Sequence, residues 1–349
     1  MLKARCDLQV HAAEPLLARF CDHYTEHGAV RRRGSIARIV IPYGAFRVHA
    51  RDGAIAFRVR AEDETRLTYM KMGVVHHLRE FLAEAAPPVR WSGDGQAGGT
   101  PSFWRDLQVV KAFDITPSMR RVVFSGQDLG RFAVSGLHVR LFFPPPGRAP
   151  GRPVLGEDGC PIWPQGADVL TPRVYTIREI DPARGEVSID ILRHDGDATP
   201  GSSFAARAAP RDPVGMAGPR GDDAPPAANR IFFFGDETAI PAIDRLLRQL
   251  PAHAAAHVAI EVANPAERQP LASAASLDLT WLFRGTDDRS LAGLARGLTH
   301  ERLGEAGYVW AGCEFSDFKA IRAHCRKGLN LDRHRHHVSA YWRRGSIGG

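Results

Sequence analysis

The sequence of 349 residues predicts a small α+β domain, then an antiparallel β-barrel, then a parallel-sheet α/β domain. Short strand-like runs with little helix fill the middle of the chain, which favours a barrel. After residue 230 strands alternate with helices, which favours a parallel sheet. A Pro/Gly-rich stretch separates both from the first ninety residues. We therefore expect domains at residues 1–88, 102–222 and 228–349, with a linker at 89–101.

The first domain is predicted to have an α-β-β-β-α order. Two sets of apolar residues recur at helical spacing, namely Leu16, Leu17, Phe20 and Tyr24 near the start, then Leu67, Met70, Val74, Leu78 and Phe81. Between them, residues 36–41, 45–50 and 54–59 read as strands joined by turns.

The barrel strands are expected near residues 106–113, 121–124, 137–143, 174–180 and 187–192. In the last domain, Ile231 to Phe234 is wholly apolar, as in a buried central strand. Helical spacing continues from Ile240 to Leu250 and from Phe318 to Leu329, with strands expected between them. We expect a helical, basic C-terminal tail, and we interpret the run His334 to His337 as solvated rather than metal-binding.

Composition restricts the class of protein. The formal net charge of +7 favours anionic partners, but the arginines look scattered along the sequence, so we do not expect nucleic-acid binding. No run reaches the roughly 20 apolar residues of a membrane span, and the first residues lack a signal-peptide core, so we expect a cytoplasmic protein without stable membrane association. The five cysteines lack the spacing of an iron–sulfur or zinc site and are expected to be reduced.

Two segments carry residues suited to a flavin and a nicotinamide. Along the strand at Arg173, a guanidinium and the ring of Tyr175 share one face, and Thr176 adds a hydroxyl. These groups suit a flavin's phosphates, its ring and its N5 edge. The turn Gly235-Asp236-Glu237-Thr238 joins an apolar strand to a helix, where Gly235 permits close approach and Asp236 or Thr238 would cap the helix. Its amides would face a dinucleotide.

With these motifs in order, residues 100–349 resemble the siderophore-interacting protein family, FAD-dependent ferric-siderophore reductases of the ferredoxin-reductase-like superfamily. Its Arg-x-Tyr-Ser/Thr flavin signature is matched at residues 173–176, and its Gly-Asp-Glu-Thr-Ala-x-Pro stretch at 235–241. The carboxyl end, from Trp310 to Glu314 and from Ala340 to Gly345, also resembles the family. The first domain resembles a small uncharacterised domain found alone or fused ahead of such proteins.

The resemblance implies a second flavin element that starts at His194 and continues to a helix start at Gly201, Ser202 and Ser203, which would hold the pyrophosphate. Here the order is Pro200-Gly201, inverted relative to the family's Gly-Pro. With a flavin in this barrel, the Pro/Gly-rich segment 144–172 is interpreted either as a flap near the flavin or as a plain surface insertion.

The resemblance further implies hydride transfer from NADPH or NADH to FAD, then single-electron reduction of an anionic ferric siderophore, with release of Fe(II). No catalytic acid or base is implied, because the cofactor carries the chemistry. A ferredoxin is an alternative donor. Lys319, Arg322, Arg343 and Arg344 are the candidates for binding the anionic chelate, and Arg268 and Arg284 for a 2′-phosphate. The alternatives are a general flavin reductase and a non-catalytic siderophore- or flavin-binding module.

Overall fold

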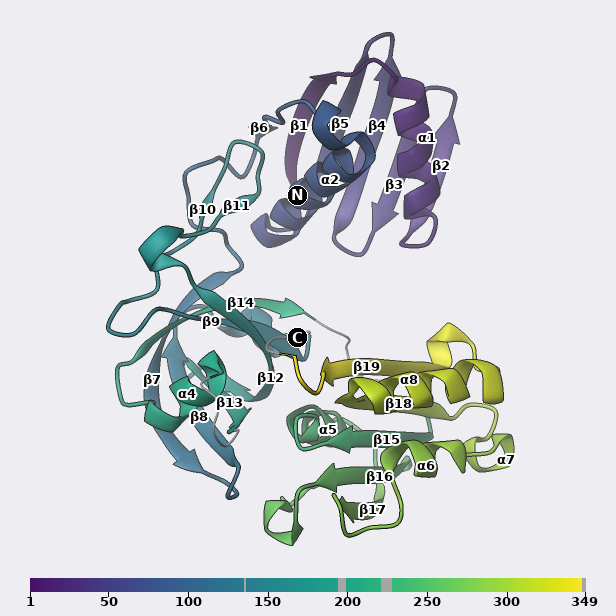
Figure 1. Cartoon of the computed structure of the whole chain (residues 1–349). Helices are drawn as coiled ribbons and strands as arrows, with labels where there is room; N and C mark the ends of the chain where they lie inside the picture. Colours follow the sequence, from purple (N-terminus) through teal and green to yellow (C-terminus); the bar gives the residue numbers. More distant parts are fainter. Residues whose placement is uncertain (135, 194–198, 221–227, 347–349) are drawn as a thin grey trace. The chain divides into compact units, whose positions relative to one another are not determined.

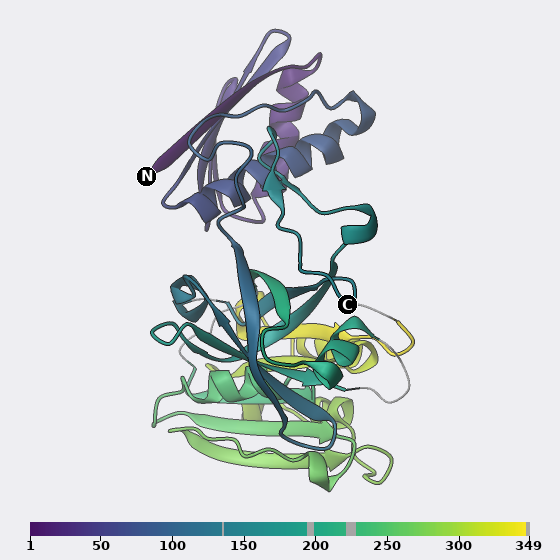
Figure 2. The ribbon, with the colours of Figure 1, turned by 90° about the vertical axis from the view of Figure 1, so that its left-hand side faces the viewer.

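The computed structural model describes residues 1–134, 136–193, 199–220 and 228–346 (Figure 1 and Figure 2). His194, one of the predicted flavin residues, lies outside the described residues. The chain divides into two compact units. The first contains residues 1–104 and 151–169, and the second contains residues 105–150 and 170–349.

The first unit is built on one antiparallel sheet with the strand order β2-β3-β4-β5-β1-β6. Its elements are β1 (Leu2–Gln9), α1 (Ala13–Tyr24), β2 (Ala29–Arg33), β3 (Ile36–Ile41), β4 (Gly44–Arg51), β5 (Ala54–Ala61), α2 (Glu64–Leu82), the 3₁₀ turn η1 (Ala83–Ala85) and β6 (Ser92–Gly93). Both helices pack on one face of the sheet (Figure 1). The predicted α-β-β-β-α order therefore lacked two strands, β1 and β2, and β6 occupies part of the expected linker.

The composition of strand β1 explains why it was not predicted from the sequence. Ala4, Cys6 and Leu8 point into the core, whereas Lys3, Arg5 and Asp7 alternate with them on the exposed side. Polar or charged residues make up half of this strand, so only its period of two distinguishes it from a loop. The core under the helices is built from Leu17, Phe20, Phe57, Leu67 and Val74, among others.

The exposed face of this sheet carries a row of arginines. Arg5, Arg58, Arg47, Arg38 and Arg31 lie directly opposite one another on five neighbouring strands. No ion pair joins these five side chains to the described residues. The face as a whole holds nine basic residues and one acidic residue, Asp7, so its own net charge is larger than the +7 of the whole chain. The nine basic residues are Lys3, Arg5, Arg31, Arg33, Arg38, Arg47, Arg51, Arg58 and Arg60. The arginines that looked scattered in the sequence are thus gathered by the fold.

Segment 151–169, part of the Pro/Gly-rich stretch, belongs to this first unit. It contains the hairpin β10 (Val154–Leu155) and β11 (Pro161–Ile162) and the turn η2 (Gly166–Asp168). The indole Nε1 of Trp91 donates to the carbonyl of Asp158 at 2.9 Å, and Arg79 pairs with the Asp158 carboxylate at 2.7 Å. Cys160 packs against the core. These contacts anchor the segment to the first unit, and the choice between a flap near the flavin and a plain surface insertion stays a prediction.

The second unit begins with a closed antiparallel barrel, as predicted, in the order β12-β13-β8-β7-β14-β9 (Figure 2). Its elements are β7 (Trp104–Asp114), β8 (Met119–Gly126), α3 (Gly130–Val134), β9 (His138–Phe143), β12 (Thr171–Asp181), β13 (Glu186–Leu192), α4 (Pro200–Arg207) and β14 (Pro213–Arg220). Apolar side chains from alternate positions fill its interior, including Phe124, Val139, Leu141, Ile177 and Ile189.

A five-stranded parallel sheet follows, also as predicted, in the order β17-β16-β15-β18-β19 (Figure 1). Its elements are β15 (Arg230–Asp236), α5 (Ile240–Leu247), β16 (Ala255–Val262), η3 (Pro265–Glu267), β17 (Ser276–Phe283), α6 (Leu291–Arg296), α7 (His300–Leu303), β18 (Tyr308–Glu314), α8 (Phe315–Ala323), the π-helical turn η4 (His324–Gly328), η5 (Arg333–Arg335) and β19 (His336–Trp342). Among the described residues, no helix has the length and apolarity needed to cross a bilayer.

The prediction of a helical C-terminal tail was wrong, and the solvated interpretation of the histidine run is confirmed for the exposed His334 but not for His336. Residues 336–342 form the edge strand β19, which pairs in parallel with β18. His336 is buried, and the His337 ring stacks on Trp310 at a centroid distance of 6.1 Å. A histidine-rich run reads as polar in sequence, but its rings supply the flat surface that packs beside an indole.

A buried ionic cluster joins the barrel to the parallel sheet. Arg178 of β12 lies 3.1 Å from Asp244 of α5 and 3.8 Å from Asp190 of β13, and both carboxylates are fully buried. Arg121 completes the cluster with two hydrogen bonds to Asp190, of 2.7 and 2.9 Å. Burial lowers the pKa of Arg178, and the two carboxylates oppose that shift. Each buried charge therefore has a partner of opposite sign.

Replacing Asp244 by Ala is expected to destabilise the second unit by about 3–5 kcal/mol, because it leaves the Arg178 guanidinium buried without its nearest partner. Urea unfolding of the full chain measures the change. The control is Arg184→Ala, which removes an exposed pair with Glu186 and should have little effect. Equal stabilities of the two variants would contradict the assignment.

Replacing Arg47 by Gln is expected to stabilise the first unit by a few tenths of a kcal/mol, because Arg47 lies between Arg38 and Arg58. Amide hydrogen exchange of β4 and β5 in the full chain would show slower opening, and the gain should shrink as salt is added. Arg66→Gln is the control, and it is expected to lower the stability of the first unit slightly, because Arg66 pairs with Glu62 and Asp63. Faster exchange in Arg47→Gln at low salt would contradict repulsion across the row.

Candidate active site

A cavity of about 350 Å³ lies in the second unit, between the barrel and the parallel sheet. Four predicted residues line it, Tyr175 and Thr176 of β12, Ser202 of α4 and Thr238 after β15. The other lining residues are Met119, His138, Val174, Asp190, Leu192, Thr199, Pro241, Ser339, Ala340 and Tyr341. The fold therefore brings the two predicted cofactor segments to one cavity, although they are about sixty residues apart in the sequence.

Tyr175 is held between the barrel wall and helix α4. Its ring meets Phe143 edge-on at a centroid distance of 6.2 Å. Burial raises the pKa of its hydroxyl, an effect that the nearby Arg173 cation opposes, so the phenol stays protonated at neutral pH. The Arg173 guanidinium donates to the carbonyl of Pro172 at 2.7 Å and does not line the cavity.

Thr176 is tied to a histidine that sequence reasoning missed. The Thr176 hydroxyl lies 3.2 Å from Nδ1 of His138, and Nε2 of His138 lies 3.2 Å from the hydroxyl of Tyr341. This chain of contacts crosses from the barrel to strand β19. His138 is paired with Thr176 in the register of β9 and β12, and the local sequence gives no signal that predicts this pairing.

The start of α4 explains the Pro200-Gly201 order. A Cβ built on Gly201 would lie 1.7 Å from the Tyr175 hydroxyl, so only glycine fits at this position. Pro200 occupies the first turn, where its missing N–H costs no hydrogen bond. The amide of Ser203 donates to the Thr199 carbonyl at 2.9 Å, which closes the first turn of the helix.

Gly235 and Asp236 are used by the fold rather than by the cavity. A Cβ on Gly235 would lie 2.7 Å from Ile243 and 2.8 Å from Ala239, so glycine allows α5 to pack on β15. Asp236 accepts hydrogen bonds from Thr238, from the Glu314 amide at 3.0 Å and from the Trp342 indole at 2.8 Å. Burial and the charge of Glu237 raise its pKa to about 6.

The predicted capping of the helix was wrong. Helix α5 starts at Ile240 with Ala239 as its N-cap, and no side chain caps it. The Asp236 carboxylate is occupied by Thr238, Glu314 and Trp342 instead, because it lies where the ends of β15, β18 and β19 meet.

The two arginines considered for a 2′-phosphate are already engaged. Arg284 makes two hydrogen bonds to Glu237, of 3.0 and 2.8 Å, and a third to Glu261 at 3.0 Å. These bonds raise the pKa of Arg284 further above its ordinary value. Arg268 lies over the Phe283 ring and donates to the Pro265 carbonyl.

The predicted chelate-binding cations gather around two stacked rings. Phe315 and Phe318 lie 5.8 Å apart, and Lys319 and Arg343 both lie over Phe315, at 5.1 and 4.8 Å from its centroid. Arg322 lies over Phe318 at 5.4 Å. Arg344 donates its backbone amide to Glu314 at 3.1 Å. None of the four lines the cavity.

Sequence profiles of three families match the chain. Residues 228–345 match the siderophore-interacting protein profile, residues 108–223 match the siderophore-interacting FAD-binding domain, and residues 5–92 match an uncharacterized protein conserved in bacteria. The two siderophore-interacting profiles together span nearly all of the second unit. The chain belongs to the siderophore-interacting protein family.

Individual relatives agree with the family. Ferric vibriobactin reductase of Vibrio cholerae is 28% identical over 247 residues, covering 69% of this chain and 90% of that protein. NADPH-dependent ferric-chelate reductase of Escherichia coli is 34% identical over 150 residues, covering 42% and 57% respectively. The crystal structure of a siderophore utilization protein from T. fusca is 33% identical with a TM-score of 0.60, covering 70% of this chain and 94% of that one.

The cavity suits the FAD-binding domain of this siderophore-interacting protein. It offers an aromatic ring at Tyr175 and hydroxyl groups at Thr176 and Ser202. The cavity also reaches the start of α4, where Thr199 and Ser202 line it.

Gly201→Ala is expected to weaken FAD binding about tenfold, because the new methyl group forces the Tyr175 ring to move. Titration of the apoprotein with FAD, followed by flavin fluorescence, measures the change. Gly130→Ala is the matched control, since nothing lies within 4 Å of a Cβ built there. An unchanged FAD affinity in Gly201→Ala would show that Tyr175 is not part of the flavin site.

Proposed function

We propose that this protein is an NAD(P)H-dependent, FAD-containing ferric-siderophore reductase that releases iron as Fe(II). The observation that carries the proposal is the cavity that brings Tyr175, Thr176, the start of α4 and Thr238 together. The siderophore-interacting FAD-binding profile and the two reductases among the relatives support it. The chemistry supplied by bound FAD is acceptance of a hydride from the nicotinamide and one-electron delivery to Fe(III).

The role of the chain's own residues in this proposal is to bind and orient the flavin and the nicotinamide. Tyr175 would stack on the flavin ring, and Thr176, held by His138, would place its hydroxyl at the edge of the ring. The start of α4 would face the pyrophosphate. The Arg173 guanidinium, which bonds the Pro172 carbonyl outside the cavity lining, would have to turn to reach it. Thr238 would contact the nicotinamide side of the cavity. Ser203 and Gly235 are left with structural roles.

The electron donor is proposed to be a nicotinamide, with NADPH favoured by the name of the Escherichia coli relative. Because Arg284 and Arg268 are engaged, a 2′-phosphate would have to displace an existing contact to reach either one. The chelate is proposed to bind beside the basic aromatic cluster of Phe315, Lys319 and Arg343. Cations gathered on one surface attract an anionic iron chelate by charge.

The first test is the absorption spectrum of the purified protein, followed by anaerobic addition of NADPH or NADH and then a ferric chelate with an Fe(II) indicator. We expect a flavin spectrum that bleaches with the nicotinamide and recovers as Fe(II) appears. A bound flavin that neither nicotinamide reduces would indicate another donor, such as a ferredoxin. Absence of flavin after reconstitution with FAD would favour a non-catalytic binding module.

Tyr175→Ala is expected to lower FAD affinity at least about tenfold, because it removes a stacking ring from the cavity. FAD content after purification and the rate of Fe(II) formation are the two measurements. Tyr43→Ala is the control, since Tyr43 is exposed in the first unit. Wild-type flavin content and turnover in Tyr175→Ala would refute the assignment of this cavity.

A further inference from the structure

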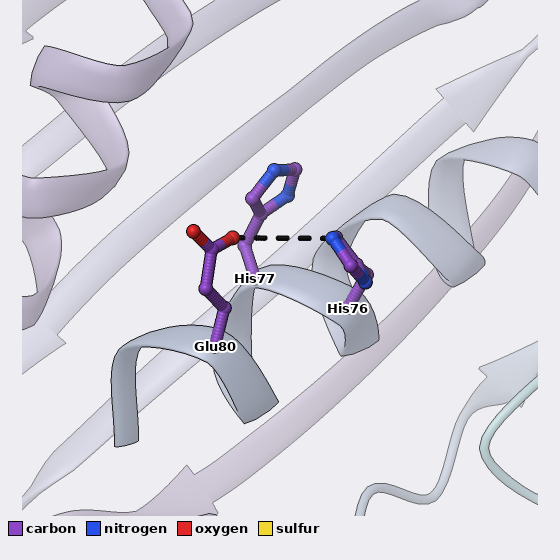
Figure 3. A group of neighbouring side chains, drawn as sticks. All are labelled: His76, His77 and Glu80. Atoms are coloured by element: carbon purple, nitrogen blue, oxygen red, sulfur yellow. Dashed lines mark ion pairs between the residues drawn. The ribbon is translucent and has the colours of Figure 1, made fainter. Parts of the chain in front are cut away.

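A cluster of histidines lies on the helical face of the first unit, in a domain for which the proposed reductase chemistry has no use. His76 and His77 lie on one turn of α2 and Glu80 lies on the next (Figure 3). One donor atom from each residue lies within 4.8 Å of the other two. Among the described residues, no other group of three histidine, cysteine or carboxylate side chains meets this spacing.

The spacing along the helix produces this arrangement. Glu80 follows His76 by four residues and His77 by three, and residues at these intervals are neighbours on one helix surface. The His76 imidazole and the Glu80 carboxylate are 3.9 Å apart, as the dashed line in Figure 3 marks. Donor atoms around a tetrahedral ion, at about 2.1 Å from it, are about 3.4 Å apart. Small rotations of two exposed side chains would therefore close the set around an ion.

The His77 ring is held by two contacts of its Nδ1. This nitrogen lies 2.7 Å from the backbone carbonyl of Gly73, one turn earlier, and 3.1 Å from the hydroxyl of Tyr24. A proton on Nδ1 that is donated to the carbonyl leaves the lone pair on Nε2. Figure 3 shows Nε2 on the far side of the ring from His76 and Glu80, so binding an ion together with them requires the His77 ring to turn.

Helix α1 brings a further imidazole to the same place. The His23 ring lies 4.1 Å from the His77 ring, and the His27 ring lies 4.8 Å from the His23 ring. Four histidines and one carboxylate thus meet where α1 ends beside α2. His23 is not part of the group of donor atoms within 4.8 Å of one another, so water would fill the remaining positions.

We propose that His76, His77 and Glu80, with His23 beside them, bind a divalent first-row transition-metal ion. Two imidazoles and one carboxylate with open positions form the donor set that proteins use for non-haem Fe(II). The site therefore accepts the ion that the proposed reductase releases, and this identification of Fe(II) as the natural ligand rests on the proposed function. In this proposal the first domain receives the product Fe(II) on the same chain that forms it.

The alternative for these residues is an ordinary surface ion pair of His76 with Glu80. Such a pair binds no ion and contributes little to stability. The two alternatives differ in one measurable property, which is saturable binding of one metal ion per chain. The relevant measurements need no FAD, so they do not depend on the reductase reaction.

The test is anaerobic titration of the full chain with Co²⁺, followed by its ligand-field absorption, and with Fe²⁺ in competition with a ferrous indicator. We expect one ion per chain and visible Co²⁺ bands typical of nitrogen and oxygen ligands. His76→Ala and Glu80→Gln should each weaken binding about tenfold or more, with unchanged circular dichroism. His49→Ala is the matched control, because His49 lies on the arginine-rich face of the sheet and not with this cluster.

Two results would overturn the proposal. One is the absence of saturable Co²⁺ and Fe²⁺ binding by the full chain at millimolar concentration. The other is binding that His76→Ala and Glu80→Gln leave unchanged, which would assign the ion to other residues. If the protein binds Co²⁺ and Fe²⁺ but reduces no ferric chelate, the metal site stands and the proposed delivery of Fe(II) fails. Failure of the metal site and failure of the proposed reductase function are therefore distinguishable.

Discussion

The buried ion cluster of Arg178, Asp190 and Asp244 is the constraint on which the candidate active site depends. It lies between the barrel and the parallel sheet, and the cavity lies beside it, with Asp190 in its wall. Buried charges favour one arrangement because every other leaves a charge unpaired at a cost of several kcal/mol. The relative placement of β12 and α5 is therefore tightly specified, and so is the distance between the two predicted cofactor segments.

Within that frame, polar contacts shared between elements organise the cavity. His138 links Thr176 of the barrel to Tyr341 of β19, and Asp236 gathers the ends of three parallel strands. A flavoenzyme needs little chemistry from its side chains but needs its cofactor held in one orientation. Motif residues such as Thr176 are consequently held in place by residues outside any motif, such as His138.

The first unit has two faces with different chemistry. Its sheet presents an uncompensated row of arginines, whereas its helices present histidines and a carboxylate. Segment 151–169, which the chain inserts after the third barrel strand, is anchored to this unit by Trp91 and Arg79. The insertion means that the two units are connected by more than the single linker expected from the sequence.

The sequence by itself indicated the barrel and the parallel sheet, because periodicity is read along the chain, and its local motifs selected Tyr175, Thr176 and Thr238 as candidates. The fold decided that these three residues line one cavity. The sequence did not reveal His138 or the row of arginines. Those depend on which strands pair and in which register, and register is decided by packing between distant segments. Only the tertiary structure could therefore place the supporting residues of the site and gather the charges of the first domain.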